Sequence, residues 1–134
     1  MKKGLTLLMP VLLMIACNYP SKNISKDDVI KDSLGYDKKL LGKWVQPIPG
    51  QEETKQGFEL DDNKTAHSIN INTMEYEKWT FSKDTLFIWG HTTGLRETSS
   101  FVDTLLVKKL SESELVVSRL GIIEGDQEIY RKTK

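Results

Sequence analysis

The sequence predicts an all-β protein whose main domain is an eight-stranded antiparallel up-and-down barrel. From residue 40 onward, short runs rich in β-branched and aromatic residues alternate with turn residues, and no segment there has a clean helical period of apolar residues. Eight strands closed into a barrel leave no free sheet edge, and their interior holds side chains or one small ligand. The expected strands are Leu41–Gln46, Gly57–Leu60, Thr65–Asn72, Glu75–Phe81, Thr85–His91, Ser99–Leu110, Glu114–Leu120 and Gln127–Lys132.

The alternation of apolar and polar residues assigns the faces of these strands. Phe58 and Leu60 lie on one face with Glu59 between them, and Trp79 and Phe81 share a face in the same way. Because side chains alternate across a strand, these apolar pairs are expected to point into the barrel.

The residues before the barrel have the layout of a secretory signal peptide. Lys2 and Lys3 are followed by the uncharged apolar run Gly4–Ile15, then by the small residue Ala16 and by Cys17. That run is shorter than the roughly 20 residues a membrane-spanning helix needs. We therefore expect a signal peptide over residues 1–16.

Met14-Ile15-Ala16-Cys17 resembles the lipobox of bacterial lipoproteins, with Met14 in place of the usual leucine. The resemblance implies cleavage before Cys17 and lipidation of its thiol. At about 0.8 kcal/mol per buried CH₂, two or three acyl chains would hold the protein firmly to a membrane. The expected location is the cell envelope, on the outer membrane. The alternative is an ordinary signal peptide with a chance cysteine.

Residues 17–39 are polar and interrupted by Pro20 and Gly35, which predicts a flexible tether. Ser25 followed by Asp28 is a weak capping box, and it favours a short helix near residues 26–34. The barrel domain is then expected over residues 40–134.

The composition excludes several classes of function. The chain has 19 basic and 19 acidic side chains, and without a polybasic block it is not expected to bind nucleic acid. Its single cysteine rules out an internal disulfide, and no catalytic motif is present, so no enzymatic activity and no cofactor are expected. His67 and His91 are far apart without neighbouring ligands, so they are expected at the surface and not in a metal site.

Two features are candidates for recognition. The aromatic residues either line a pocket for an apolar molecule or simply fill a small barrel. The long connections Gln46–Gln56 and Gly90–Thr98 are expected to rim or cap the barrel, where they could contact a partner. The aromatic set is Trp44, Phe58, Trp79, Phe81, Trp89 and Phe101.

Gly42-Lys43-Trp44 resembles the G-x-W signature on the first strand of lipocalins. With the lipobox and the strand count, the chain is similar to the small lipocalin-like lipoproteins of Gram-negative bacteria. The resemblance implies that Trp44 closes one end of the barrel and packs against an arginine of the last strand, for which Arg131 is the candidate.

Two functions follow from these expectations. The first is a membrane-anchored lipoprotein whose barrel binds a small hydrophobic ligand, which the resemblance favours. The second is a non-enzymatic envelope protein with a side-chain-filled barrel whose loops contact a protein partner. An internal cavity would favour the first function, and a filled interior with an exposed apolar patch would favour the second.

Overall fold

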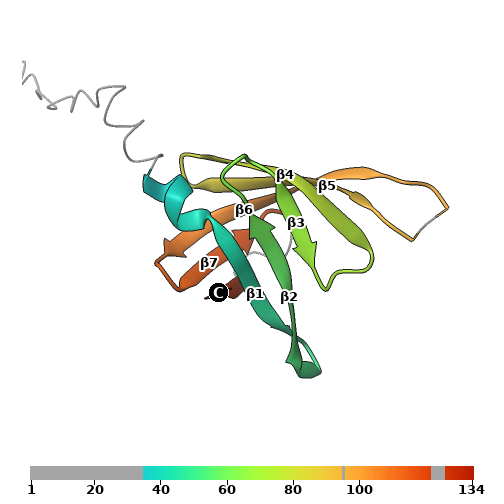
Figure 1. The fold of residues 1–134 in the computed structure, drawn as a ribbon, viewed down its shortest axis with the longest axis horizontal. Coiled ribbons are helices and arrows are strands. Elements are labelled where there is room, and N and C mark those ends of the chain that lie inside the picture. Colours follow the sequence, from blue (N-terminus) through green and yellow to red (C-terminus); the bar gives the residue numbers. More distant parts are fainter. Residues whose placement is uncertain (1–34, 95, 122–125) are drawn as a thin grey trace, which may run out of the picture.

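The computed structural model describes residues 35–94, 96–121 and 126–134, and these form a short helix followed by one eight-stranded antiparallel sheet (Figure 1). The predicted fold class is confirmed. The strands are β1 (Gly42–Ile48), β2 (Gln51–Leu60), β3 (Ala66–Ile69), β4 (Met74–Ser82), β5 (Thr85–Thr92), β6 (Ser100–Leu110), β7 (Glu114–Arg119) and β8 (Gln127–Thr133).

The sheet curls into a nearly closed barrel in which β3 and β4 flank the seam. The strand order is β3-β2-β1-β8-β7-β6-β5-β4, so the first and last strands pair with each other. At the seam the ladder is reduced to a bridge between Thr65 and Lys78, and the Tyr76 amide donates to the Ser68 hydroxyl at 2.9 Å. Strands β3 and β4 therefore lie next to each other at the seam without a continuous row of hydrogen bonds between them.

Two glycines allow neighbouring strands to approach closely where the sheet bends. A Cβ on Gly57 of β2 would lie 1.9 Å from the Trp44 carbonyl oxygen, and one on Gly90 of β5 would lie 2.2 Å from the Glu75 carbonyl oxygen. Gly90 faces β4 beside a register shift between Tyr76 and Lys78. Glycine and a bulge together give the curvature that barrel closure requires.

The helix covers residues 35–40 and packs against the barrel, with the Leu40 side chain fully buried. Residues 35–39 thus belong to this helix, whereas the sequence predicts them to be part of the tether. The leader, Cys17 and the helix expected near residues 26–34 lie outside the described residues. Within the described part of the chain, no helix is long and apolar enough to cross a membrane.

The connection expected over Gln46–Gln56 is instead a tight hairpin, so that prediction was wrong. Strand β1 runs to Ile48, β2 begins at Gln51, and Gly50 takes a φ of 80° in the turn between them. Pro47 lies within β1 and does not end the strand. The β1–β2 and β5–β6 hairpins extend beyond the barrel body in Figure 1.

Candidate functional site

The barrel has two ends of different chemistry. At the closed end lie the helix, the starts of β1, β5 and β7, and the short connections from β2 to β3, β4 to β5 and β6 to β7. The interior beside this end is apolar and buried. Its buried residues include Leu40, Trp44, Leu60, Ala66, Trp79, Phe81, Leu86, Leu105 and Leu115.

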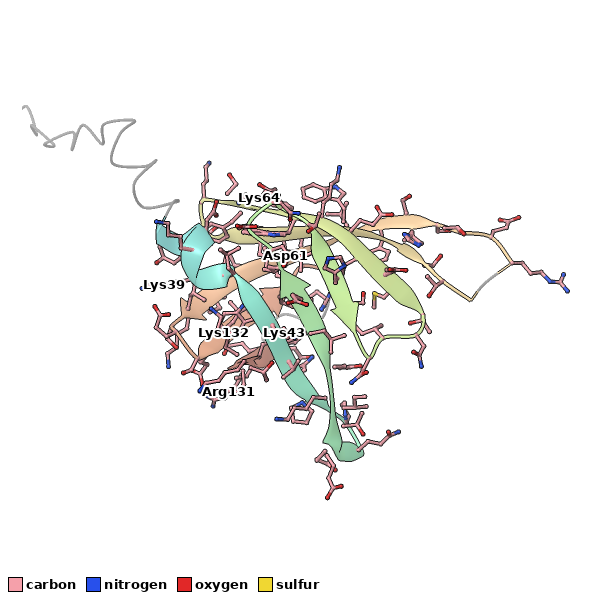
Figure 2. The ribbon with its side chains drawn as sticks, in the orientation of Figure 1. Lys39, Lys43, Asp61, Lys64, Arg131 and Lys132 are labelled. Atoms are coloured by element: carbon pink, nitrogen blue, oxygen red, sulfur yellow. The ribbon has the colours of Figure 1, made fainter. Side chains whose placement is uncertain are left out.

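Trp44 locks the helix to this closed end. Its ring is fully buried, and its indole N–H donates to the Leu40 carbonyl oxygen at 2.7 Å. The Lys132 Nζ lies 5.0 Å from the ring centroid and donates to the Lys39 carbonyl oxygen at 2.9 Å. Figure 2 shows Lys39 and Lys132 together beside the helix. One indole and one ammonium group therefore hold the helix, β1 and β8 together.

The expected stacking of Arg131 on Trp44 was wrong. The cation over the indole is Lys132, which is the register partner of Trp44, whereas Arg131 is paired with Val45 and points outward. Arg131 instead forms a 2.6 Å ion pair with Glu114 and its side chain is 64% exposed. A shift of one residue moves a side chain to the opposite face of a strand, so the neighbouring residue takes the role.

Gly42, the first residue of the Gly42-Lys43-Trp44 motif, leaves room for the Lys132 side chain. Gly42 has a φ of 114°, a backbone conformation that side-chain-bearing residues rarely adopt. A Cβ there would lie 3.1 Å from the Cε of Lys132. The lysine stem thus crosses over Gly42 to reach Trp44.

Trp79 repeats this arrangement on the other side of the closed end. Its indole N–H donates to the Asp61 carbonyl oxygen at 2.9 Å, and the Lys64 Nζ lies 3.9 Å from its ring centroid. Lys64 is held there by a 2.6 Å ion pair with Asp37 of the helix. Two buried tryptophans, each covered by a lysine, therefore close this end.

The opposite, open end contains charged side chains that point into the barrel. Arg119 of β7 contacts Asp103 of β6 through Nη1 at 2.6 Å, and it binds Glu128 of β8 through Nε and Nη2 at 3.0 and 3.1 Å. We call these three residues the Arg119 cluster. Their side chains are 21%, 17% and 25% exposed, so solvent reaches them although they face inward.

Two tyrosines extend the Arg119 cluster across the barrel. The Tyr76 hydroxyl of β4 donates to Asp103, and the Tyr130 hydroxyl of β8 donates to Glu128 at 2.5 Å. Gln46 of β1 in turn donates to the Tyr130 oxygen at 3.3 Å. Five strands thus meet in one hydrogen-bonded network.

The network shifts the pKa values of its members. Burial, followed by the hydrogen bonds to Asp103 and Glu128, raises the pKa values of Tyr76 and Tyr130 well above that of free tyrosine, so both hydroxyls stay protonated donors. Burial alone would raise the pKa of Glu128, but its hydrogen bonds with Arg119 and Tyr130 outweigh burial and lower it. The stability that this carboxylate contributes is present above the pKa of an unfolded glutamate and is lost as pH falls through its lower folded pKa.

Aromatic rings line the same region. The Phe58 centroid lies 5.0 Å from that of Tyr130 and 6.2 Å from that of Tyr76, and Tyr76 lies 5.8 Å from Phe101. Ile71, Met74 and Phe101 are partly buried hydrophobic residues that pack against the core. The open end therefore offers aromatic and aliphatic surface directly beside charged groups.

Comparisons with known proteins agree with this architecture. Residues 36–133 match a family model described as lipocalin-like. The chain belongs to the lipocalin-like family. A solved lipocalin-like protein from Bacteroides thetaiotaomicron is 34% identical, with a TM-score of 0.62, and the match covers 71% of this chain and 97% of that one. No curated protein matches this lipocalin-like chain significantly.

The proposed aromatic pocket of this lipocalin-like protein is only partly assembled. Trp44, Trp79 and Phe81 fill the closed end, so there the filled-barrel alternative describes the structure. Phe58 is buried midway, and Phe101 lies at the open end. Trp89 was placed wrongly.

Trp89 lies on the outer face of β5 beside Phe87, with ring centroids 6.1 Å apart, and Lys78 lies 5.2 Å from its ring. The inward positions of this strand belong to Leu86, Ile88 and Gly90. Trp89 lies in the apolar run Leu86-Phe87-Ile88-Trp89, where no polar neighbour indicates which residues face the interior.

The Arg119 cluster was not predicted from the sequence, although a signal was present. Asp103 alternates with Leu105, Arg119 with Val117, and Glu128 with Tyr130, so three adjacent strands each place a charge at an inward position. Charged residues at inward positions of neighbouring strands predict an ion-paired cluster. Only correct strand pairing shows that all three meet.

Both histidines lie on the outer surface of the lipocalin-like barrel, as expected. The His67 Nε2 lies 3.2 Å from an oxygen of Asp61, and the His91 Nδ1 lies 2.8 Å from an oxygen of Glu77. Within the described ranges, no three histidine, cysteine or acidic residues gather as a metal site would need. The Gly90–Thr98 segment splits between β5 and the β5–β6 connection at the open end.

Proposed function

We propose that this lipocalin-like protein is a non-enzymatic envelope lipoprotein that binds a small, largely hydrophobic ligand at the open end of its barrel. The observation that carries the proposal is the Arg119 cluster, whose polar groups face inward and yet remain in contact with solvent. Polar groups inside a barrel are stable when hydrogen-bonded to one another, to water or to a ligand. Ligand sites typically combine apolar walls with a few such convergent polar groups.

The packing of the barrel supports a ligand at the open end. The closed end is filled by Trp44 and Trp79, so the ligand must enter between the hairpins of the open end. Its apolar part would contact Phe101 and Met74, and its polar part would meet the Arg119 cluster.

A test is to titrate the uncharged amphiphile octanol into the folded protein and follow backbone amide signals by nuclear magnetic resonance. We expect saturable shifts at Tyr76, Phe101 and Tyr130, with little change at Trp44. The variant Phe101→Trp narrows the open end and should weaken the binding while the melting temperature stays close to that of the wild type. Shifts confined to the outer face, or no saturable shift, would contradict the proposal.

We also propose that lipids on Cys17 hold the protein in the cell envelope, on the outer membrane. The support is the charged, apolar and small-residue layout of the leader together with the lipobox-like Met14–Cys17. A Cys17→Ser variant should move from the membrane fraction to the soluble or unprocessed fraction. Normal processing and unchanged membrane association of that variant would contradict the lipid anchor.

The alternative, an envelope interaction protein, has one observation in its favour. On the outer face of β5, Phe87 and Trp89 are partly exposed beside Val102, which is 46% exposed. If octanol fails to bind while Trp89→Ser abolishes capture of a protein partner, this alternative replaces the ligand-binding function.

A further inference from the structure

The charge of the Arg119 cluster is negative. One guanidinium faces two carboxylates, those of Asp103 and Glu128, and Glu128 holds it with two hydrogen bonds. A ligand carboxylate or phosphate would have to displace one of these carboxylates, or lie next to an uncompensated negative charge. The Arg119 guanidinium is therefore already paired with the protein's own carboxylates.

The described residues around the open end are also mainly acidic. Lys55 and Arg96 are the basic residues on its hairpins, apart from the Arg119 cluster. The acidic residues there are Glu52, Glu53, Glu75, Glu97 and Asp126, all of them exposed. A surface that carries mainly one sign of charge attracts ions of the opposite sign.

The aromatic rings beside the Arg119 cluster also favour a cation. Phe58, Tyr76, Phe101 and Tyr130 form a continuous set of rings with neighbouring centroids 5.0 to 6.2 Å apart. Ring faces attract ammonium ions, and groups of aromatic rings are the common way in which proteins bind quaternary or protonated amines.

We propose that the open end selects a ligand that carries an ammonium group, protonated or quaternary, on a short apolar body. The ammonium group lies on the solvent side of Arg119, close to the carboxylates of Asp103 and Glu128 and to the rings of Tyr76 and Tyr130. The apolar body contacts Phe101. This proposal names the ligand class of the proposed function and therefore rests on it.

The test compares three amphiphiles that differ only in their head groups: octylamine, octanol and octanoate. Binding to the barrel is measured by calorimetry and by amide shifts at Tyr76 and Tyr130, at neutral pH and low salt, where octylamine is protonated. One charge interacting with a partly exposed carboxylate is worth about a tenfold change in affinity, or about 1.4 kcal/mol. We expect octylamine to bind about tenfold more tightly than octanol, and octanoate more weakly than octanol.

The variant Glu128→Gln neutralises the cluster while keeping the size of the side chain and one of its two acceptor oxygens. It should weaken octylamine binding about tenfold and leave octanol binding nearly unchanged. Glu112→Gln, in the exposed turn between β6 and β7 at the closed end, is the matched control and should change neither affinity. If Glu128→Gln does not fold, Phe101→Leu tests the aromatic contribution, again by the ratio of octylamine to octanol binding.

The outcomes separate this inference from the proposed function. If octanol binds at the open end but octylamine binds no better, or octanoate binds best, the ammonium preference is overturned and ligand binding stands. If none of the three binds, the ligand-binding function fails with it.

Discussion

Replacing Lys132 with alanine should destabilise the barrel more than replacing Arg131, although the two are neighbours of equal charge on β8. The Lys132 Nζ lies 5.0 Å from the Trp44 ring centroid and binds the Lys39 carbonyl oxygen of the helix. The Arg131 side chain is 64% exposed and contacts Glu114 on the outer face of the sheet.

These contacts give the expected magnitudes. Because the Lys132 ammonium group is itself partly exposed, its attraction to the Trp44 ring contributes about 0.5–1 kcal/mol, and its hydrogen bond to the Lys39 carbonyl contributes about 1 kcal/mol. Lys132→Ala should therefore lose about 1–2 kcal/mol of unfolding free energy. Trp44→Ala removes a fully buried indole and should lose about 3–5 kcal/mol, a large part of the total stability of a domain this size. Arg131→Ala should change the stability by no more than the error of the measurement.

The assay is urea unfolding followed by far-ultraviolet circular dichroism, with a double-mutant cycle between residues 44 and 132. The two losses should be non-additive, because the side chains are in contact. The cycle between residues 44 and 131 serves as the control and should be additive. Equal losses for Lys132→Ala and Arg131→Ala, or additivity between residues 44 and 132, would refute the assignment of Lys132 as the closing cation.

Three further predictions concern the remainder of the barrel. Gly57→Ala should lose about 2–4 kcal/mol because its Cβ would meet the carbonyl oxygen of the neighbouring strand at 1.9 Å, whereas Gly35→Ala, with open space around it, should be neutral in the same unfolding assay. Arg119→Met leaves two partly buried carboxylates without their cation, so it should lose about 2–3 kcal/mol at pH 7, and less as pH falls and Glu128 protonates. A loss that is independent of pH would contradict the ion-paired cluster. Tyr76 and Tyr130 should show no tyrosinate absorbance until the protein unfolds at alkaline pH, because burial and neighbouring carboxylates raise their pKa values. If Tyr76→Phe or Tyr130→Phe lowers the tyrosinate absorbance that is seen below the unfolding pH, this prediction is contradicted.

The sequence alone determined the class of the fold and most strand positions. Each of the eight expected runs overlaps an observed strand, since alternation along a strand is a local property that requires no knowledge of the partner strands. The inward positions of Phe58, Leu60, Trp79 and Phe81 followed from the same alternation. Where no alternation existed, as around Trp89, the face could not be predicted.

Only the tertiary structure decided which residues meet. The partner of Trp44 depended on the register between β1 and β8, and a difference of one residue exchanged Arg131 for Lys132. The Arg119 cluster joins three consecutive strands, and its members are ordinary charged residues until the pairing of β6, β7 and β8 brings them together. Local sequence fixes the face on which a side chain lies, but its neighbours across the sheet depend on register and closure, which are set by the packing of the whole barrel.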